Sequence, residues 1–109
     1  MAVGDAPVID AIAEINAASL TRTELDPRSL LLVRLAALAA VDAPVSSYLL
    51  HVGPSVDAGL TAADAEDVLV AVAPIVGTPR TASAAARIVA ALGLAIEIAK
   101  EDAESAQDA

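Results

Sequence analysis

The 109-residue chain has no cysteine, phenylalanine or tryptophan, and it has one histidine and one tyrosine. Without cysteine it can form no disulfide, no thiolate nucleophile and no cysteine-based metal site. A single histidine cannot build a metal centre with several histidine ligands. The lone aromatic residue, Tyr48, offers no platform on which nucleic-acid bases could stack. We therefore expect neither a metal nor another cofactor.

Basic residues are also scarce, since six Lys and Arg stand against fifteen Asp and Glu, for a net charge of −9. This charge, with no basic run, argues against nucleic acid and anionic membranes as partners. The mean hydropathy is +0.67, yet the longest uncharged stretches, residues 43–56 and 68–79, are shorter than the roughly 18–20 residues of a membrane span. No basic region precedes an apolar one at the N-terminus, so we expect no signal peptide and a soluble, cytoplasmic protein.

Alanine dominates what is present, with 28 of the 62 apolar residues. Ala and Leu, the best helix formers, together number 41. Proline and glycine divide the chain into five or six segments, and no run alternates as a strand would. We predict an all-α fold, a compact bundle of five to six helices. Residues 1–22 would form an N-terminal helix and link, residues 23–100 a helical domain, and residues 101–109 an acidic tail that should fray.

The first two helices have clear sequence signals. Residues 7–20 place three isoleucines at three-residue steps, which predicts a narrow apolar stripe. Asp26 followed by Pro27 is typical of an N-cap and a first helical position. The helix over residues 27–41 is apolar nearly all round except for Arg34, which indicates a buried helix.

Three further helices are predicted downstream. Asp42-Ala43-Pro44 repeats the cap-and-proline signal and would open a helix over residues 43–58. Thr61 begins the next one, and Asp64 at its third position forms a variant of the capping box. The last helix would reach the tail only if Gly93 does not break it.

Burial of this much apolar surface is difficult in a chain of this length. A monomer of this size hides only about 60–65% of its chain surface. Exposed apolar patches of several hundred Å² are unusual on stable monomers. We therefore predict a homo-oligomer with helical interfaces.

Few residues offer chemistry, and each has a structural alternative. Histidine is the side chain whose ordinary pKa lies closest to neutrality, and Ser47 and Tyr48 lie four and three residues before His51, on one helical face. Arg34 is costly within an apolar helix unless it is paired or faces a cavity. The alternatives are a hydrogen-bonded structural His51, a Ser47 bonded to a carbonyl, a packed Tyr48, and an inter-helix or intersubunit salt bridge for Arg34.

Several short motifs resemble the carboxymuconolactone decarboxylase family, which includes the alkylhydroperoxidase D-like proteins. The resemblance covers roughly residues 23–94 and implies an all-helical fold that assembles into trimers or hexamers. The motifs that carry it, in chain order, are Leu25-Asp26-Pro27-Arg28, Leu32-Val33-Arg34-Leu35-Ala36, His51, Gly59-Leu60-Thr61 and Gly77-Thr78-Pro79-Arg80.

The sequence departs from the peroxidase branch of that family. That branch uses a C-x-x-C pair whose second cysteine lies four residues before the histidine, and Pro44 and Ser47 occupy those positions here. A glutamate of the preceding helix appears as Leu32. Because neither Pro nor Ser forms a thiolate or a disulfide, the resemblance does not extend to thiol peroxidase activity.

The other branch implies cofactor-free chemistry on a small carboxylate or lactone. In that reading Arg34 pairs with a substrate carboxylate, and His51 protonates the carbon left after CO₂ departs. Tyr48 and Ser47 complete the candidate site. Ile75 and Thr78 replace aromatic residues common in the family, which implies a smaller or differently shaped pocket. The alternative is a non-catalytic helical oligomer with a degenerate site, retained for binding or assembly.

Overall fold

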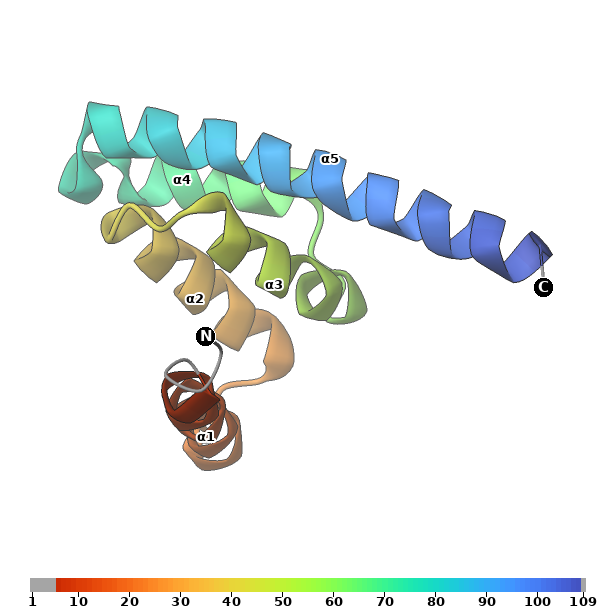
Figure 1. The fold of residues 1–109 in the computed structure, drawn as a ribbon. Helices are drawn as coiled ribbons and strands as arrows, with labels where there is room; N and C mark the ends of the chain where they lie inside the picture. The colour runs from red at the N-terminus through yellow and green to blue at the C-terminus, as the bar shows by residue number, and fades with distance from the viewer. Residues whose placement is uncertain (1–5, 109) are drawn as a thin grey trace.

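The structure, a computed structural model, describes residues 6–108, the last of these by its backbone alone. Within this range the chain forms five helices and no strand, which confirms the all-α prediction. Helices α2 to α5 pack together, whereas α1 lies apart from them (Figure 1). The helices are α1 (Ala6–Arg22), α2 (Pro27–Ala40), α3 (Val45–Asp57), α4 (Ala62–Val76) and α5 (Thr78–Asp108).

The predicted caps of α2 and α4 are present. The Asp26 carboxylate accepts a hydrogen bond from the Ser29 amide at 3.3 Å, and Pro27 opens α2. At α4, the Asp64 amide donates to Thr61 Oγ1 at 3.2 Å, and the Thr61 amide donates to Asp64 Oδ2 at 2.8 Å. This reciprocal pair satisfies two amides that the helix itself leaves without acceptors.

The predicted cap at Asp42 is wrong. α3 begins only at Val45, after Pro44, whose side chain makes no capping bond. Asp42 lies instead in the left-handed region with φ 55°, which aspartate tolerates better than most residues. Its carboxylate accepts from Ser83 Oγ at 3.0 Å and from Arg87 Nη1 at 2.8 Å, so it joins the α2–α3 turn to α5.

α5 runs unbroken through Gly93 to Asp108, so the acidic tail continues the helix, and the fraying of residues 101–109 stays a prediction. Ala, Glu and Gln, all good helix formers, make up six of the nine residues 101–109, which favours helix enough to outweigh one glycine. The second half of α5 projects beyond the bundle (Figure 1). Among the described helices, α5 alone is long and apolar enough by composition to span a membrane, a test that core helices of soluble proteins also pass.

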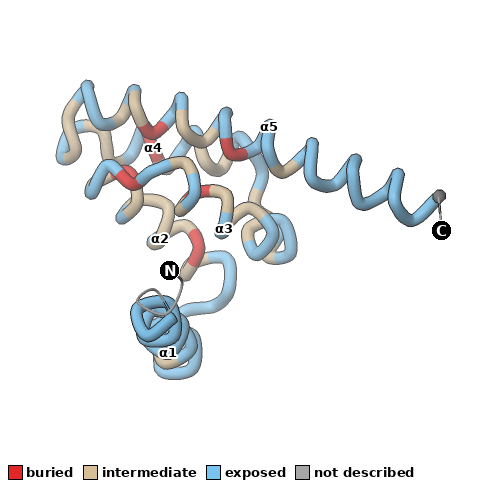
Figure 2. Tube along the Cα trace, viewed as in Figure 1, coloured by how far each residue is buried: buried red, intermediate tan, exposed pale blue. Residues whose placement is uncertain are grey.

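The core is small and built largely of alanine. The buried residues are Leu31, Ala39, Ala43, Tyr48, Leu69, Ala84 and Ala91. They are scattered along the inner sides of α2 to α5 (Figure 2). Such small side chains let the helix backbones approach closely, but they remove little apolar surface from water.

The prediction that α2 is a buried helix is not met within one chain. Of its residues only Leu31 and Ala39 are buried, and Val33 is 55% exposed. Four helices are too few to surround α2 on every side. Among the described residues, seventeen large apolar side chains remain exposed, which is the burial problem anticipated from the sequence.

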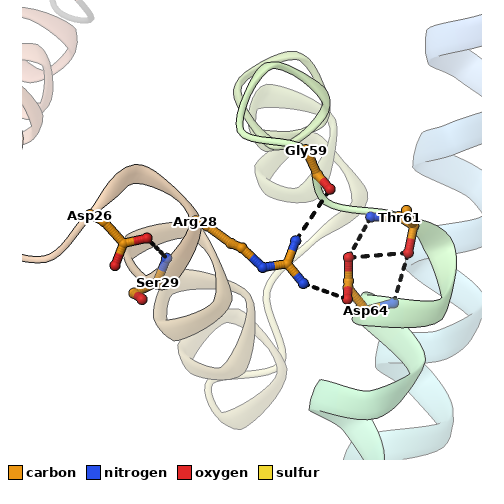
Figure 3. Close-up of polar contacts among 6 residues, drawn as sticks. All are labelled: Asp26, Arg28, Ser29, Gly59, Thr61 and Asp64. Carbon is orange, nitrogen blue, oxygen red and sulfur yellow. Dashed lines mark hydrogen bonds and ion pairs between the residues drawn. The ribbon is translucent and has the colours of Figure 1, made fainter.

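An ion pair fastens the beginning of α2 to the beginning of α4. Arg28 Nη2 lies 2.7 Å from Asp64 Oδ1, and Arg28 Nη1 donates to the Gly59 carbonyl at 3.2 Å (Figure 3). The Arg28 hydrogen bond, with help from the Thr61 amide, lowers the pKa of Asp64 from its ordinary 3.8 to about 2. The stability that this carboxylate contributes is therefore complete above about pH 4 and is lost as the pH falls through about 2.

We expect Asp64→Asn to make the free energy of unfolding depend less on pH between 4 and 2, because asparagine has no proton to take up in that range. Urea denaturation at a series of pH values would measure it. Asp67→Asn is the matched control, since the exposed Asp67 side chain forms no ion pair among the described residues. If the free energy of unfolding changed equally with pH in Asp64→Asn and the wild type, the lowered pKa assigned to Asp64 would be contradicted.

Candidate functional site

His51 has a defined ring orientation on α3. Its Nδ1 lies 2.7 Å from the backbone carbonyl of Ser47, one turn earlier. A carbonyl oxygen only accepts, so Nδ1 carries the hydrogen of this bond. In the neutral ring Nε2 is then the free acceptor, available to take up a proton. Ser47 therefore orients the His51 ring through its backbone carbonyl.

His51 and Arg34 lie on the walls of one open cleft. The cleft has a volume of about 900 Å³ and separates α1 from α2 and α3. Most of its lining is apolar, including Ile9, Ile12 and Leu20 of α1. The structure therefore brings together the two residues to which the sequence assigned proton transfer and carboxylate binding.

The Arg34 guanidinium has only neutral partners among the described residues. Its Nη1 donates to Asn16 Oδ1 at 2.7 Å, and its Nη2 donates to Ser19 Oγ at 3.0 Å. The inter-helix salt bridge considered for Arg34 is absent from residues 6–108. Two of its five N–H groups are used, so positive charge and donors remain for an anion.

A second, smaller cavity of about 190 Å³ lies among α2 to α5. It is lined by His51, Tyr48, Ser55 and Thr61 together with aliphatic side chains. Tyr48 is only 3% exposed, and its hydroxyl has no hydrogen-bond partner in the described part of the chain. Burial raises the pKa of this phenol, so it remains a neutral donor.

The four predicted site residues therefore do not converge on one pocket. His51 borders both spaces, Arg34 borders only the cleft, and Tyr48 borders only the inner cavity. Ser47 lines neither. Sequence reasoning missed Asn16 and Ser19, the partners of Arg34. The available signal was weak, because Asn16 and Ser19 are two of several polar residues on the first helix.

Comparison with known proteins decides the family. The sequence model of the carboxymuconolactone decarboxylase family matches residues 6–91. The chain belongs to this family. Neither a curated protein nor a solved structure matches it.

Membership in the carboxymuconolactone decarboxylase family confirms the resemblance and extends it. The match begins at residue 6, so it includes α1 and the partners of Arg34, whereas the recognised motifs began near residue 23. This member has no cysteine anywhere in its sequence. The thiol chemistry of the peroxidase branch is therefore closed to it.

The Tyr48 hydroxyl leads to a stability prediction. Tyr48→Phe should raise the free energy of unfolding by about 1–2 kcal/mol, because it removes a buried polar group that has no partner. Chemical denaturation without ligand would measure this change. A loss of stability would mean that the hydroxyl has a hydrogen-bond partner in solution.

Proposed function

We propose that this family member performs cofactor-free acid/base chemistry on a small lactone acid or related carboxylate. His51 would transfer the proton and Arg34 would bind the carboxylate. The observation that supports this most is their position on one cleft, where, among the described residues, His51 Nε2 has no hydrogen-bond partner and Arg34 bonds only to neutral groups.

The proposed reaction is loss of CO₂ followed by protonation of carbon. The bond from the substrate carbon to its carboxylate breaks, CO₂ leaves, and the electron pair stays on carbon, delocalised into the lactone carbonyl. The protonated His51 ring then delivers its Nε2 proton to that carbon and becomes neutral. The bond from Nδ1 to the Ser47 carbonyl holds the ring in orientation throughout.

Tyr48 would act at the other side of His51. Its neutral hydroxyl needs an acceptor, and a carbonyl oxygen of a ligand reaching the inner cavity would supply one. Such a bond would stabilise the negative charge that develops on that oxygen when CO₂ leaves. Tyr48→Phe would then lower turnover even though it stabilises the ligand-free fold.

The test is a panel of small lactone acids and open-chain carboxylates, with binding followed by thermal shift and turnover by CO₂ release. We expect Arg34→Gln to weaken carboxylate binding about 10- to 100-fold, since it removes a charge-assisted contact worth about 1.5–3 kcal/mol. Arg34→Lys keeps the charge but not the planar fork, so its affinity for the carboxylate should lie between those of the wild type and Arg34→Gln. Binding that is unaffected by Arg34→Gln would remove Arg34 from the site. Binding with no CO₂ release from any lactone acid would favour the non-catalytic alternative.

A further inference from the structure

We propose that the cleft between α1 and α2–α3 is filled by the projecting end of α5 from a second copy of this chain, and that this insertion completes the site at His51. The contact between the end of α5 and the cleft is inferred from the exposed surfaces of the two elements and does not depend on the proposed function. Its role in completing the site rests on the proposed function.

The cleft presents two apolar walls that do not touch. On α1, Ile9 and Ile12 are 62% and 61% exposed and line the cleft. Leu31 and Leu50 line the opposite side. α1 packs closely against none of the other described helices, and its polar ties are the two bonds to Arg34. A 17-residue helix is only marginally stable in water by itself, so α1 requires an apolar partner.

The end of α5 likewise has an exposed apolar face that nothing in the described part of the chain covers. Ala91 is the last buried residue, and the helix continues to Asp108. Ile88, which packs against the core, is followed on the same helical face by Leu92, Ile96 and Ala99. Ile96 is 56% exposed, and it lies on the part of α5 that follows the last buried residue, which is mostly exposed (Figure 2).

The two helical segments match in length. At 1.5 Å per residue, α1 and the segment from residue 92 to 108 each extend about 25 Å. Packed helices have axes 8–10 Å apart, so one helix inserted between α1 and α2–α3 would contact both walls. Within one chain this cannot occur, because α5 makes no contact with α1 and its end projects away from it (Figure 1).

Charge favours a second copy over other occupants. The face of α5 opposite the apolar stripe carries Glu97, Glu101 and Glu104, which oppose insertion into an anionic membrane. Arg22, in the last turn of α1, forms no ion pair among the described residues and offers these carboxylates an opposite charge. Each chain has one such cleft and one such helix end, so every copy can both donate a helix end and receive one.

Insertion would change the chemistry of the site. His51 and Arg34 border a cleft that is open to water in a single chain. A helix from the next copy would cover that opening and lower the local dielectric, which strengthens the attraction between Arg34 and a carboxylate. It would also keep water from protonating the carbanion before His51 does.

Because the chain has no cysteine, single introduced thiols report the contact without background. Ile12→Cys and Ile96→Cys proteins would be mixed, equilibrated and treated with a short bismaleimide. We expect a cross-linked dimer that contains one chain of each variant. Ile75→Cys, 89% exposed on α4, is the control and should not couple to Ile12→Cys. Coupling of Ile12→Cys only to itself, or no coupling to Ile96→Cys, would overturn the proposal.

A second variant separates assembly from activity. Ile96→Glu should convert the assembly to monomer in sedimentation and reduce any lactone turnover at least tenfold, whereas the control Ile75→Glu should do neither. Dissociation with unchanged turnover would refute the role in completing the site, and an intact assembly would refute the contact. His51→Gln, added to the Ile12→Cys and Ile96→Cys variants, should leave their cross-linking unchanged, so loss of the proposed function leaves this test standing.

Discussion

Replacing His51 by glutamine is expected to lower turnover of a small lactone acid by about two to four orders of magnitude, the usual contribution of a positioned proton donor. Glutamine occupies a similar volume, but its amide cannot deliver a proton near neutral pH. The ring orientation set by the Ser47 carbonyl would be lost in the same step. Steady-state CO₂ release by the purified variant would measure the effect.

The control for this experiment is the folded state of the same variant. His51 is half-buried and outside the core cluster, so the variant should melt and sediment like the wild type. Loss of turnover with an intact assembly would mark His51 as the proton-transfer residue. An unchanged rate would remove it from the mechanism.

Truncating Leu69 to alanine should lower the free energy of unfolding by about 2–5 kcal/mol. Leu69 is the only buried residue of α4, and it belongs to a core whose other members are mostly alanines. The truncation removes buried apolar atoms and leaves a cavity, and the two costs add. A domain of this size is stable by about 5–15 kcal/mol in total, so this one change would remove a large share.

Val70→Ala is the matched control, since it shortens the adjacent side chain, which is 73% exposed. It should change stability by no more than about 0.5 kcal/mol. Equilibrium denaturation of both variants would make the comparison. Similar losses for the two would show that Val70 is buried in solution, against another chain.

Local signals predicted the helices well because they act over a few residues. Asp26-Pro27 and the Thr61–Asp64 pair form the caps that their spacing indicates. The cap prediction at Asp42 was wrong because the same Asp-x-Pro pattern also suits a turn residue in the left-handed region. What decided between the two was contact with Ser83 and Arg87, more than forty residues away in sequence.

The candidate site shows the same division. That His51 and Tyr48 share α3 follows from spacing alone. That Arg34 borders the cleft with His51 while Tyr48 borders a separate cavity depends on how α1, α2 and α3 are placed, which no spacing specifies.

By itself, then, the sequence determined an all-helical chain without thiol chemistry, since alanine content, caps and the absence of cysteine are local or compositional properties. Only the tertiary structure decided that α1 stands away from the bundle, that α5 projects beyond it, and that Arg34, with only neutral partners among the described residues, borders the same cleft as His51. The physical reason is that these outcomes depend on which apolar faces find partners, and a core made mainly of alanines leaves several of them without one.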